Sequence, residues 1–272
     1  MAWWTSPVRK ILLSLLVLQG LAAPSQAAEA ACPTSLGRRA ARLVPAADTA
    51  QTSAAPLRLP LPAAGDYRHL LRPTPLGWAR LAHWCVWVEP VTVSGPAAMW
   101  DQRWLTAIEQ ALLQWQELLP ITRVGDPGAA QVLVFRRRPP LAREASGRTR
   151  ASHGRALLEL VEVDRGNGWR LEPRVEVLIS PGQRQEATEA TALHELGHAF
   201  GLWGHSDDAG DAMAAVPGAR PVLLLSPRDR ATLQWLYRQP TRFGQSPAAG
   251  PATERRVPVN TQRAPEAVPA TP

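Results

Sequence analysis

Two histidines spaced four residues apart in a proline-free stretch constrain this chain more than any other feature. His194 and His198 lie within residues 187–202, whose composition suits a helix despite Gly197. On a helix, residues i and i+4 share one face, so both imidazoles can bind the same metal ion. Glu195 follows the first histidine directly and can reach a water molecule on that ion without becoming a ligand. The stretch therefore predicts a helix that carries a metal site with an adjacent carboxylate.

The residues after this helix supply a candidate third ligand. Gly201 stands three residues after His198, where a glycine lets the chain leave the helix with a positive φ. The chain can then turn back and bring the imidazole of His205 to the metal. We therefore expect Gly201 to support the site and His205 to complete a set of three histidine ligands.

The combined pattern resembles the zinc motif of the metzincin metallopeptidases, and among them the matrixin-like branch. The usual motif is H-E-x-x-H-x-x-G-x-x-H, whereas this chain has Gly204 in place of the last histidine and His205 immediately after it. We interpret the difference as a one-residue insertion in the turn, which the flexible Gly204 tolerates. Some metzincin-like enzymes use an aspartate as the third ligand, so Asp207 and Asp208 remain alternatives. His205 is preferred because imidazole suits zinc and because its reach is shorter.

The resemblance extends further along the chain. Metzincins have a methionine-containing turn beneath the metal, and Met213 lies a short loop after His205. Its role would be to support the ligands and not to bind the metal. Ser226, Pro227 and Asp229 then supply an N-cap, a first helical position and a capping box. Matrixin-like domains close with a helix that is introduced in a similar way.

The resemblance implies a zinc-dependent endopeptidase with one catalytic Zn²⁺. His194, His198 and His205 would hold the metal, which lowers the pKa of a bound water, and Glu195 would act as the general base. The partner would be a protein or peptide that binds as an extended strand along the edge of the sheet. Residues 214–221 resemble in position the wall of the pocket that selects the residue after the scissile bond.

Two other functions would use the same residues. One is a non-catalytic zinc- or peptide-binding module on a metzincin frame, although metal binding alone does not require Glu195. The other is a zinc hydrolase of a non-peptide amide, such as a bond of the cell wall. A structural calcium ion at Asp164 and the 166–168 turn is a further alternative, but an ordinary hairpin turn explains these residues.

Hydrophobic periodicity predicts an α/β (α+β) fold, in which a twisted mixed sheet is backed by a long helix and the active-site helix. The resemblance makes this a metzincin-like fold. Apolar residues recur at three- and four-residue spacing over residues 100–119, so we expect this long helix to bury its tryptophans, Trp100 among them. Pro120 ends it. The predicted strands are residues 84–88, 131–136, 156–164 and 174–180.

The two ends of the chain differ in composition from its middle. The first residues combine two basic side chains, an apolar run too short for a comfortable membrane span, and small residues that suit a cleavage site. We therefore expect an exported protein, periplasmic or secreted, without a membrane span after cleavage; an uncleaved anchor is the alternative. The predicted segments are a signal peptide at 1–27, an Ala/Pro-rich arm or short pro-segment at 28–65, a catalytic domain at 66–243 and a disordered tail at 244–272.

Charge and cysteine usage add further expectations. The formal net charge is +7. We interpret it as a coding bias towards arginine and expect no nucleic-acid partner, because no nucleic-acid-binding motif is present. Cys32 and Cys85 either pair in an exported protein or remain free thiols, and both interpretations stay open. A role for Cys32 as a switch that caps the metal is a further hypothesis.

Overall fold

The computed structural model of the chain describes the following residues: 32, 40–43, 65–91, 94–143, 149–150, 152–164 and 168–245. The predicted signal peptide, almost all of the predicted tail, and residues 166 and 167 of the turn considered for calcium lie outside these residues. Within the described part of the chain, none of the helices combines the length and the apolar character needed to cross a membrane.

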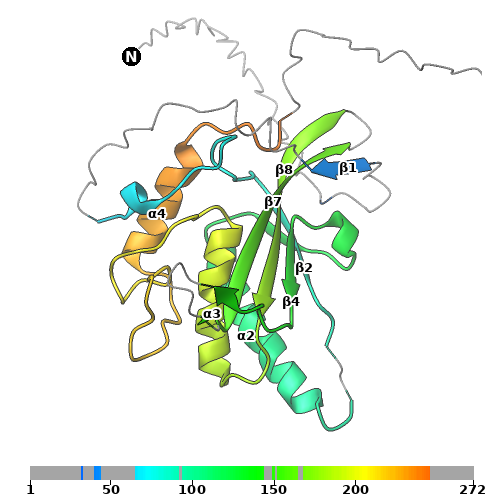
Figure 1. Cartoon of the computed structure of the whole chain (residues 1–272), viewed down its shortest axis with the longest axis vertical. Coiled ribbons are helices and arrows are strands. Elements are labelled where there is room, and N and C mark those ends of the chain that lie inside the picture. The colour runs from blue at the N-terminus through cyan, green and yellow to red at the C-terminus, as the bar shows by residue number, and fades with distance from the viewer. Residues whose placement is uncertain are drawn as a thin grey trace, which may run out of the picture. The chain divides into compact units, whose positions relative to one another are not determined.

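A six-stranded mixed sheet organises the described fold, with the strand order β1-β7-β8-β4-β2-β3 (Figure 1). The strands that pair in parallel are β2 (Trp84–Val88), β3 (Ile121–Arg123), β4 (Val132–Phe135) and β8 (Trp169–Ile179). The strands that add antiparallel pairings are β7 (Gly154–Asp164), which pairs with β8, and β1 (Ala40–Leu43), which pairs with β7. The predicted mixed sheet is therefore confirmed, and all four predicted strands are present.

Some strand boundaries differ from the prediction. β8 begins at Trp169 and not at residue 174, because β7 and β8 form a long hairpin in which Asp164 pairs with Trp169. β3 was not predicted, since it is only three residues long and mostly exposed, so it has no hydrophobic pattern. A separate small pair joins β5 (Ala142–Arg143) to β6 (Thr149–Arg150).

Within the described residues, three α-helices accompany the sheet: α2 (Ala98–Gln116), α3 (Gln185–Ala199) and α4 (Pro227–Arg238). The same residues include two short 3₁₀ turns, η2 (Arg68–Leu70) and η3 (Pro127–Ala129). α4 begins with the expected capping box, in which the Ser226 side chain accepts from the Asp229 amide and the Asp229 side chain accepts from the Ser226 amide. Pro227 occupies the first turn, where its missing N–H costs nothing.

The tryptophans of α2 do not all enter the core. Trp104 and Trp115 are buried, as predicted, but Trp100 is 49% exposed and the prediction for it is wrong. Trp100 lies in the first turn of α2, and the guanidinium of Arg103 stacks over its ring at 4.8 Å. The cation covers the apolar ring at the surface, so the helical spacing does not require burial there.

One hydrophobic core joins the sheet to α2 and α3. Val86, Val132 and Val175 lie side by side across β2, β4 and β8, and all are buried. Ile108 of α2 and Leu193 of α3 belong to the same buried cluster. Fully burying an aliphatic side chain contributes about 1.5–3 kcal/mol, so this layer fixes α3 against the sheet.

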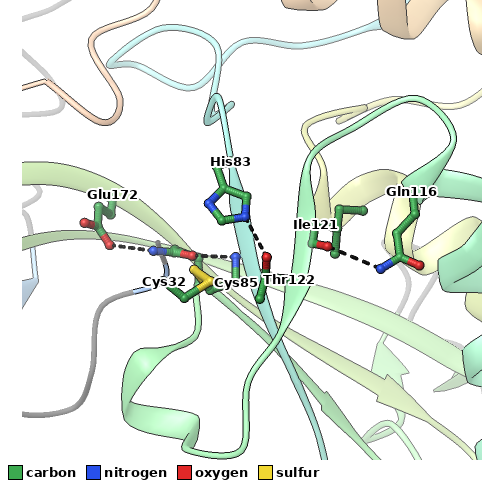
Figure 2. The surroundings of a disulfide bond; sticks show 8 residues. Cys32, His83, Cys85, Gln116, Ile121, Thr122 and Glu172 are labelled. Atoms are coloured by element: carbon green, nitrogen blue, oxygen red, sulfur yellow. Dashed lines mark hydrogen bonds between the residues drawn. A yellow bond between two sulfur atoms is a disulfide. The ribbon is translucent and has the colours of Figure 1, made fainter. Parts of the chain in front are cut away.

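Part of the predicted arm belongs to the folded unit. Cys32 forms a disulfide with Cys85 of β2, with the Cα atoms 5.7 Å apart (Figure 2). β1 extends the sheet, with Ala40 opposite Asp164 and Leu43 opposite Val161. The sequence did not predict β1, because its pairing partner is supplied by the tertiary structure and not by a local pattern.

The disulfide also decides two open questions about its cysteines. Cys32 and Cys85 lie close to His83, but two sulfurs bonded to each other are not thiolate ligands for a metal. For the same reason the hypothesis that Cys32 caps the metal is wrong. Instead, His83 Nε2 lies 2.9 Å from Thr122 Oγ1, and the Cys85 amide donates to the Gln131 side chain (Figure 2).

Removing the disulfide should lower the free energy of unfolding. The bridge joins residues separated by 53 positions, and a loop of this length corresponds to about 4 kcal/mol of chain entropy in the unfolded state. We expect the double variant Cys32→Ser/Cys85→Ser to lose roughly 2–4 kcal/mol in denaturant titration. The unreduced wild type, once denatured, should show no titratable thiol. Equal unfolding midpoints for the two proteins would contradict this role for the bridge.

Candidate metal centre

Three histidines meet at the end of α3. His194 and His198 come from the helix and His205 from the loop that follows it, and one nitrogen of each lies within 4.8 Å of the other two. The imidazole centroids are 4.8 Å apart for His194 and His198, 5.2 Å for His194 and His205, and 4.9 Å for His198 and His205. The structure therefore contains a candidate metal site made of the three predicted residues.

Backbone carbonyls set the orientation of the two helical imidazoles. His194 Nδ1 lies 2.8 Å from the carbonyl oxygen of Ala212, and His198 Nδ1 lies 2.8 Å from that of Leu202. A carbonyl can only accept, so each Nδ1 carries the proton and each Nε2 keeps a free lone pair. Metal-binding histidines in proteins typically use their second nitrogen in this way.

The environment keeps these histidines neutral. Burial lowers the pKa of His198 to about 3, and the neighbouring His194 acts in the same direction. Burial also lowers the pKa of His194 and of His205. A metal ligand must be unprotonated, so the donor set fits a divalent cation at neutral pH.

Two glycines shape the loop that brings His205 to the other histidines. Gly201 has φ +108°, as predicted for a chain leaving a helix, and it packs against the Ala79 carbonyl. Gly204 has φ +154°, and a Cβ on it would overlap the backbone of Leu70 and Leu71. Gly204 is thus required by close packing, and not only by the flexibility inferred from the sequence.

The loop is held on its other side as well. The amide of Ser206 donates to the Met213 carbonyl at 2.7 Å, and the amide of Ala215 donates to the Ser206 carbonyl at 3.1 Å. These bonds fix the residue directly after His205 to the turn that carries Met213.

The two alternative aspartate ligands lie elsewhere. Asp207 accepts a hydrogen bond from Arg228 at 2.7 Å, and Asp208 lies 3.5 Å from the same guanidinium. Neither belongs to the histidine cluster. Among the described residues, the geometry therefore favours His205 as the third ligand.

Met213 supports α3 from below the site. Its side chain is fully buried, and its sulfur occupies the space next to Gly197, in the middle of the histidine motif. A Cβ on Gly197 would collide with that sulfur and approach the Trp115 ring to 3.0 Å. Trp115 also donates from Nε1 to the Leu193 carbonyl at 3.1 Å. This packing explains why a glycine stands inside the helix, which the sequence alone did not.

A buried carboxylate holds the turn before Met213. Asp229 is fully buried and accepts from the Ala212 amide at 2.8 Å and from the Tyr67 hydroxyl at 2.7 Å. The Ala212 carbonyl accepts from His194, so Asp229 helps to orient the His194 imidazole through the backbone of Ala212. The sequence showed Asp229 only as a capping-box residue, and no local signal indicated its second role.

Asp211 forms a second buried junction beside the first. Its carboxylate accepts from the hydroxyls of Ser206 and Ser226, at 2.5 and 2.6 Å, and lies 3.1 Å from the Arg228 guanidinium. It therefore connects the residue after His205 to the start of α4.

Glu195 lies between α3 and the beginning of β7. A Cβ on Gly154 would come within 2.7 Å of Glu195 Cγ, so only a glycine lets the strand approach this closely. Burial raises the pKa of Glu195 to about 7, while a hydrogen bond to the Ala156 backbone and the charge of Arg155 oppose that rise. The carboxyl lines the same cavity as His194.

A cavity of about 500 Å³ opens next to His194 and Glu195. Its walls come from residues 152–154, from the start of α3, and from the segment between 209 and 222. Residues 214–221, which were expected to form a pocket wall, line it with the exception of Val216. His153 also lines the cavity. Its volume is in the range of ordinary ligand pockets.

Comparison with known proteins adds no family. No protein-family model matches the chain, and none of the curated proteins matches it.

Replacing Asp229 should weaken both the fold and the metal site. In Asp229→Ala, the Tyr67 hydroxyl and the amides of Ala212 and Ser226 lose their acceptor. Each unpaired buried donor costs about 1–3 kcal/mol, so we expect a loss of at least about 3 kcal/mol. We also expect weaker Zn²⁺ binding, because the peptide backbone that orients His194 is no longer held.

Tyr67→Phe is the matched control, since it removes one of the three donors and keeps the carboxylate. It should cost about 1 kcal/mol and leave the Zn²⁺ affinity unchanged. Denaturant titration and competition with a chromophoric chelator measure the two effects. The proposed link between Asp229 and His194 is wrong if both variants bind Zn²⁺ as the wild type does.

Proposed function

We propose that this chain is an exported zinc-dependent endopeptidase that resembles the matrixin-like metzincins. The observation that carries the proposal is that Glu195 and His194 line one cavity, while His194 belongs to a cluster of three imidazoles whose nitrogens lie within 4.8 Å of one another. A binding site for a metal alone would need the imidazoles but not the carboxylate.

The donor set suits zinc. His194, His198 and His205 supply three neutral nitrogen ligands, which is the composition of many catalytic zinc sites with one position left for water or substrate. A zinc ion held there would lower the pKa of a water molecule and polarise a substrate carbonyl.

Glu195 would act as general base and then as general acid. Its carboxylate would take a proton from the attacking water and deliver it to the nitrogen of the leaving amine. The pKa of about 7 that burial gives this carboxyl is compatible with both directions of transfer.

β7 offers an edge on which a peptide can bind. Within the described strands, residues 154–160 pair only with β8, because β1 covers β7 from Val161 onward. The His153 carbonyl accepts from Ser180 of the segment after β8. Strand alternation then points the hydrogen-bonding groups of Leu158 and the carbonyl of Ala156 away from β8, while the Ala156 amide is held by Glu195. An extended peptide can add to this edge with its scissile bond near Glu195.

The disulfide supports export. A bridge such as Cys32–Cys85 forms and persists in oxidising compartments and is uncommon in the cytosol. We therefore propose a periplasmic or secreted location and a protein or peptide substrate, with no nucleic-acid partner.

Glu195→Gln should abolish cleavage and keep the metal. With the general base removed, we expect the rate to fall by about 10²–10⁴-fold, while the three ligands still bind one Zn²⁺. The assay follows cleavage of casein by the full chain, with and without a chelator, and measures bound zinc in both proteins. Glu186→Gln is the control, because Glu186 lies on the same helix, is exposed and does not line the cavity.

The outcomes separate the three functions. Chelator-sensitive cleavage that is lost in Glu195→Gln supports the endopeptidase. Bound zinc without cleavage of casein by the wild type would favour a binding module, or a hydrolase of a non-peptide amide if cell-wall fragments are cleaved instead.

A further inference from the structure

Two exposed arginines line the cavity beside Glu195. They are Arg184 at the start of α3 and Arg220 in the segment that follows Met213. Arg155 does not line the cavity, but its charge lowers the pKa of Glu195. Most of the remaining lining is uncharged and small, with alanine, glycine and proline predominating.

The acidic residues of the lining do not neutralise these arginines. Glu195 is the candidate general base and lies next to the histidines. Asp211 is buried, and its carboxylate is occupied by Ser206, Ser226 and Arg228. Within the described residues, no ion pair is formed by Arg184 or Arg220.

An arginine guanidinium is well suited to bind a carboxylate. Its planar fork donates two parallel hydrogen bonds to the two oxygens, and such charge-assisted bonds are stronger than neutral ones. The cavity is large enough for an acidic side chain together with part of its backbone. Small lining side chains leave room for a group that reaches towards the arginines.

We propose that this cavity selects an acidic side chain, aspartate or glutamate, on a substrate residue adjacent to the bond that is cleaved. The inference rests on the proposed function for the reaction, since His194 and Glu195 share the cavity wall. It adds the chemical class of the residue that the cavity accepts, with Arg184 and Arg220 as the residues that determine specificity.

The first test uses alanine-rich peptides that differ only in one residue, which is Glu, Gln or Lys. Mass spectrometry of the products locates the cleaved bond, and the variable residue is placed on each side of it in turn. On one side we expect kcat/KM to be about tenfold higher for Glu than for Gln, and lowest for Lys. The preference should decline at high salt, because exposed charges are screened.

Charge reversal gives the sharper test. The full chain with Arg184→Glu and Arg220→Glu should prefer the Lys peptide over the Glu peptide. Arg138→Ala is the control, because Arg138 is exposed and does not line the cavity, and it should keep the preference for Glu. Equal rates for Glu and Gln peptides in the wild type would overturn the inference, as would an unchanged preference after charge reversal.

Binding separates this inference from the reaction itself. The same peptides, labelled with a fluorophore, are titrated into the zinc-loaded Glu195→Gln chain, which should bind the Glu peptide about tenfold more tightly than the Gln peptide. If no peptide is cleaved by the wild type but this difference in Kd remains, the proposed reaction fails and the acidic specificity stands. A Gln peptide with a free C-terminal carboxylate, in place of a C-terminal amide, is the last comparison. If it binds as tightly as the Glu peptide, the cavity recognises chain ends and the side-chain assignment is wrong.

Discussion

The hydrogen bond from His194 Nδ1 to the carbonyl of Ala212 is the interaction on which the rest of the site depends. It joins the helix that carries two candidate ligands to the turn that places Met213 beneath them. Asp229 holds the amide of the same alanine, so this one residue is fixed on both sides. The same turn is hydrogen-bonded to Ser206, the residue directly after His205, and so fixes the backbone next to His205. The three histidines are thereby positioned by the backbone of one turn.

This arrangement buries polar groups that are stable only when all are paired. The carboxylates of Asp229 and Asp211 are almost fully buried, and each accepts at least two hydrogen bonds. A network of this kind is expensive if it is incomplete, since every unpaired buried donor carries its full desolvation penalty. It therefore restricts the region to one arrangement, and that arrangement leaves three neutral imidazoles facing each other. Metal binding at such a site stabilises the folded state, because the unfolded chain has no equivalent site.

Local patterns predicted much of the fold and the residues of the site. The apolar run at residues 84–88 and the spacing of His194 and His198 are properties of single elements, and the structure has the strand and the helix that they predict. The capping box at Ser226 is equally local, and it too is present. The positive φ of Gly201 follows from the need to leave a helix, which again requires no knowledge of distant residues.

The features that could not be predicted arise from contacts between distant segments. Gly197 is needed because Met213 packs against it, and Gly154 because Glu195 approaches β7. The second role of Asp229 depends on Tyr67, which lies far away in the sequence. Trp100 shows the reverse case, since a helical pattern included it in the core although its ring lies at the surface under Arg103. Periodicity identifies which face of a helix is apolar. The tertiary structure decides how many turns of that face are covered by the sheet.

The most direct test of the account is a crystal structure of the zinc-loaded chain with anomalous data collected at the zinc absorption edge. We expect one strong peak at which the Nε2 atoms of His194, His198 and His205 each lie about 2.0–2.1 Å from the metal, with one oxygen from water completing the site. A peak coordinated by Asp207 or Asp208 in place of His205, or no peak near α3, would contradict it.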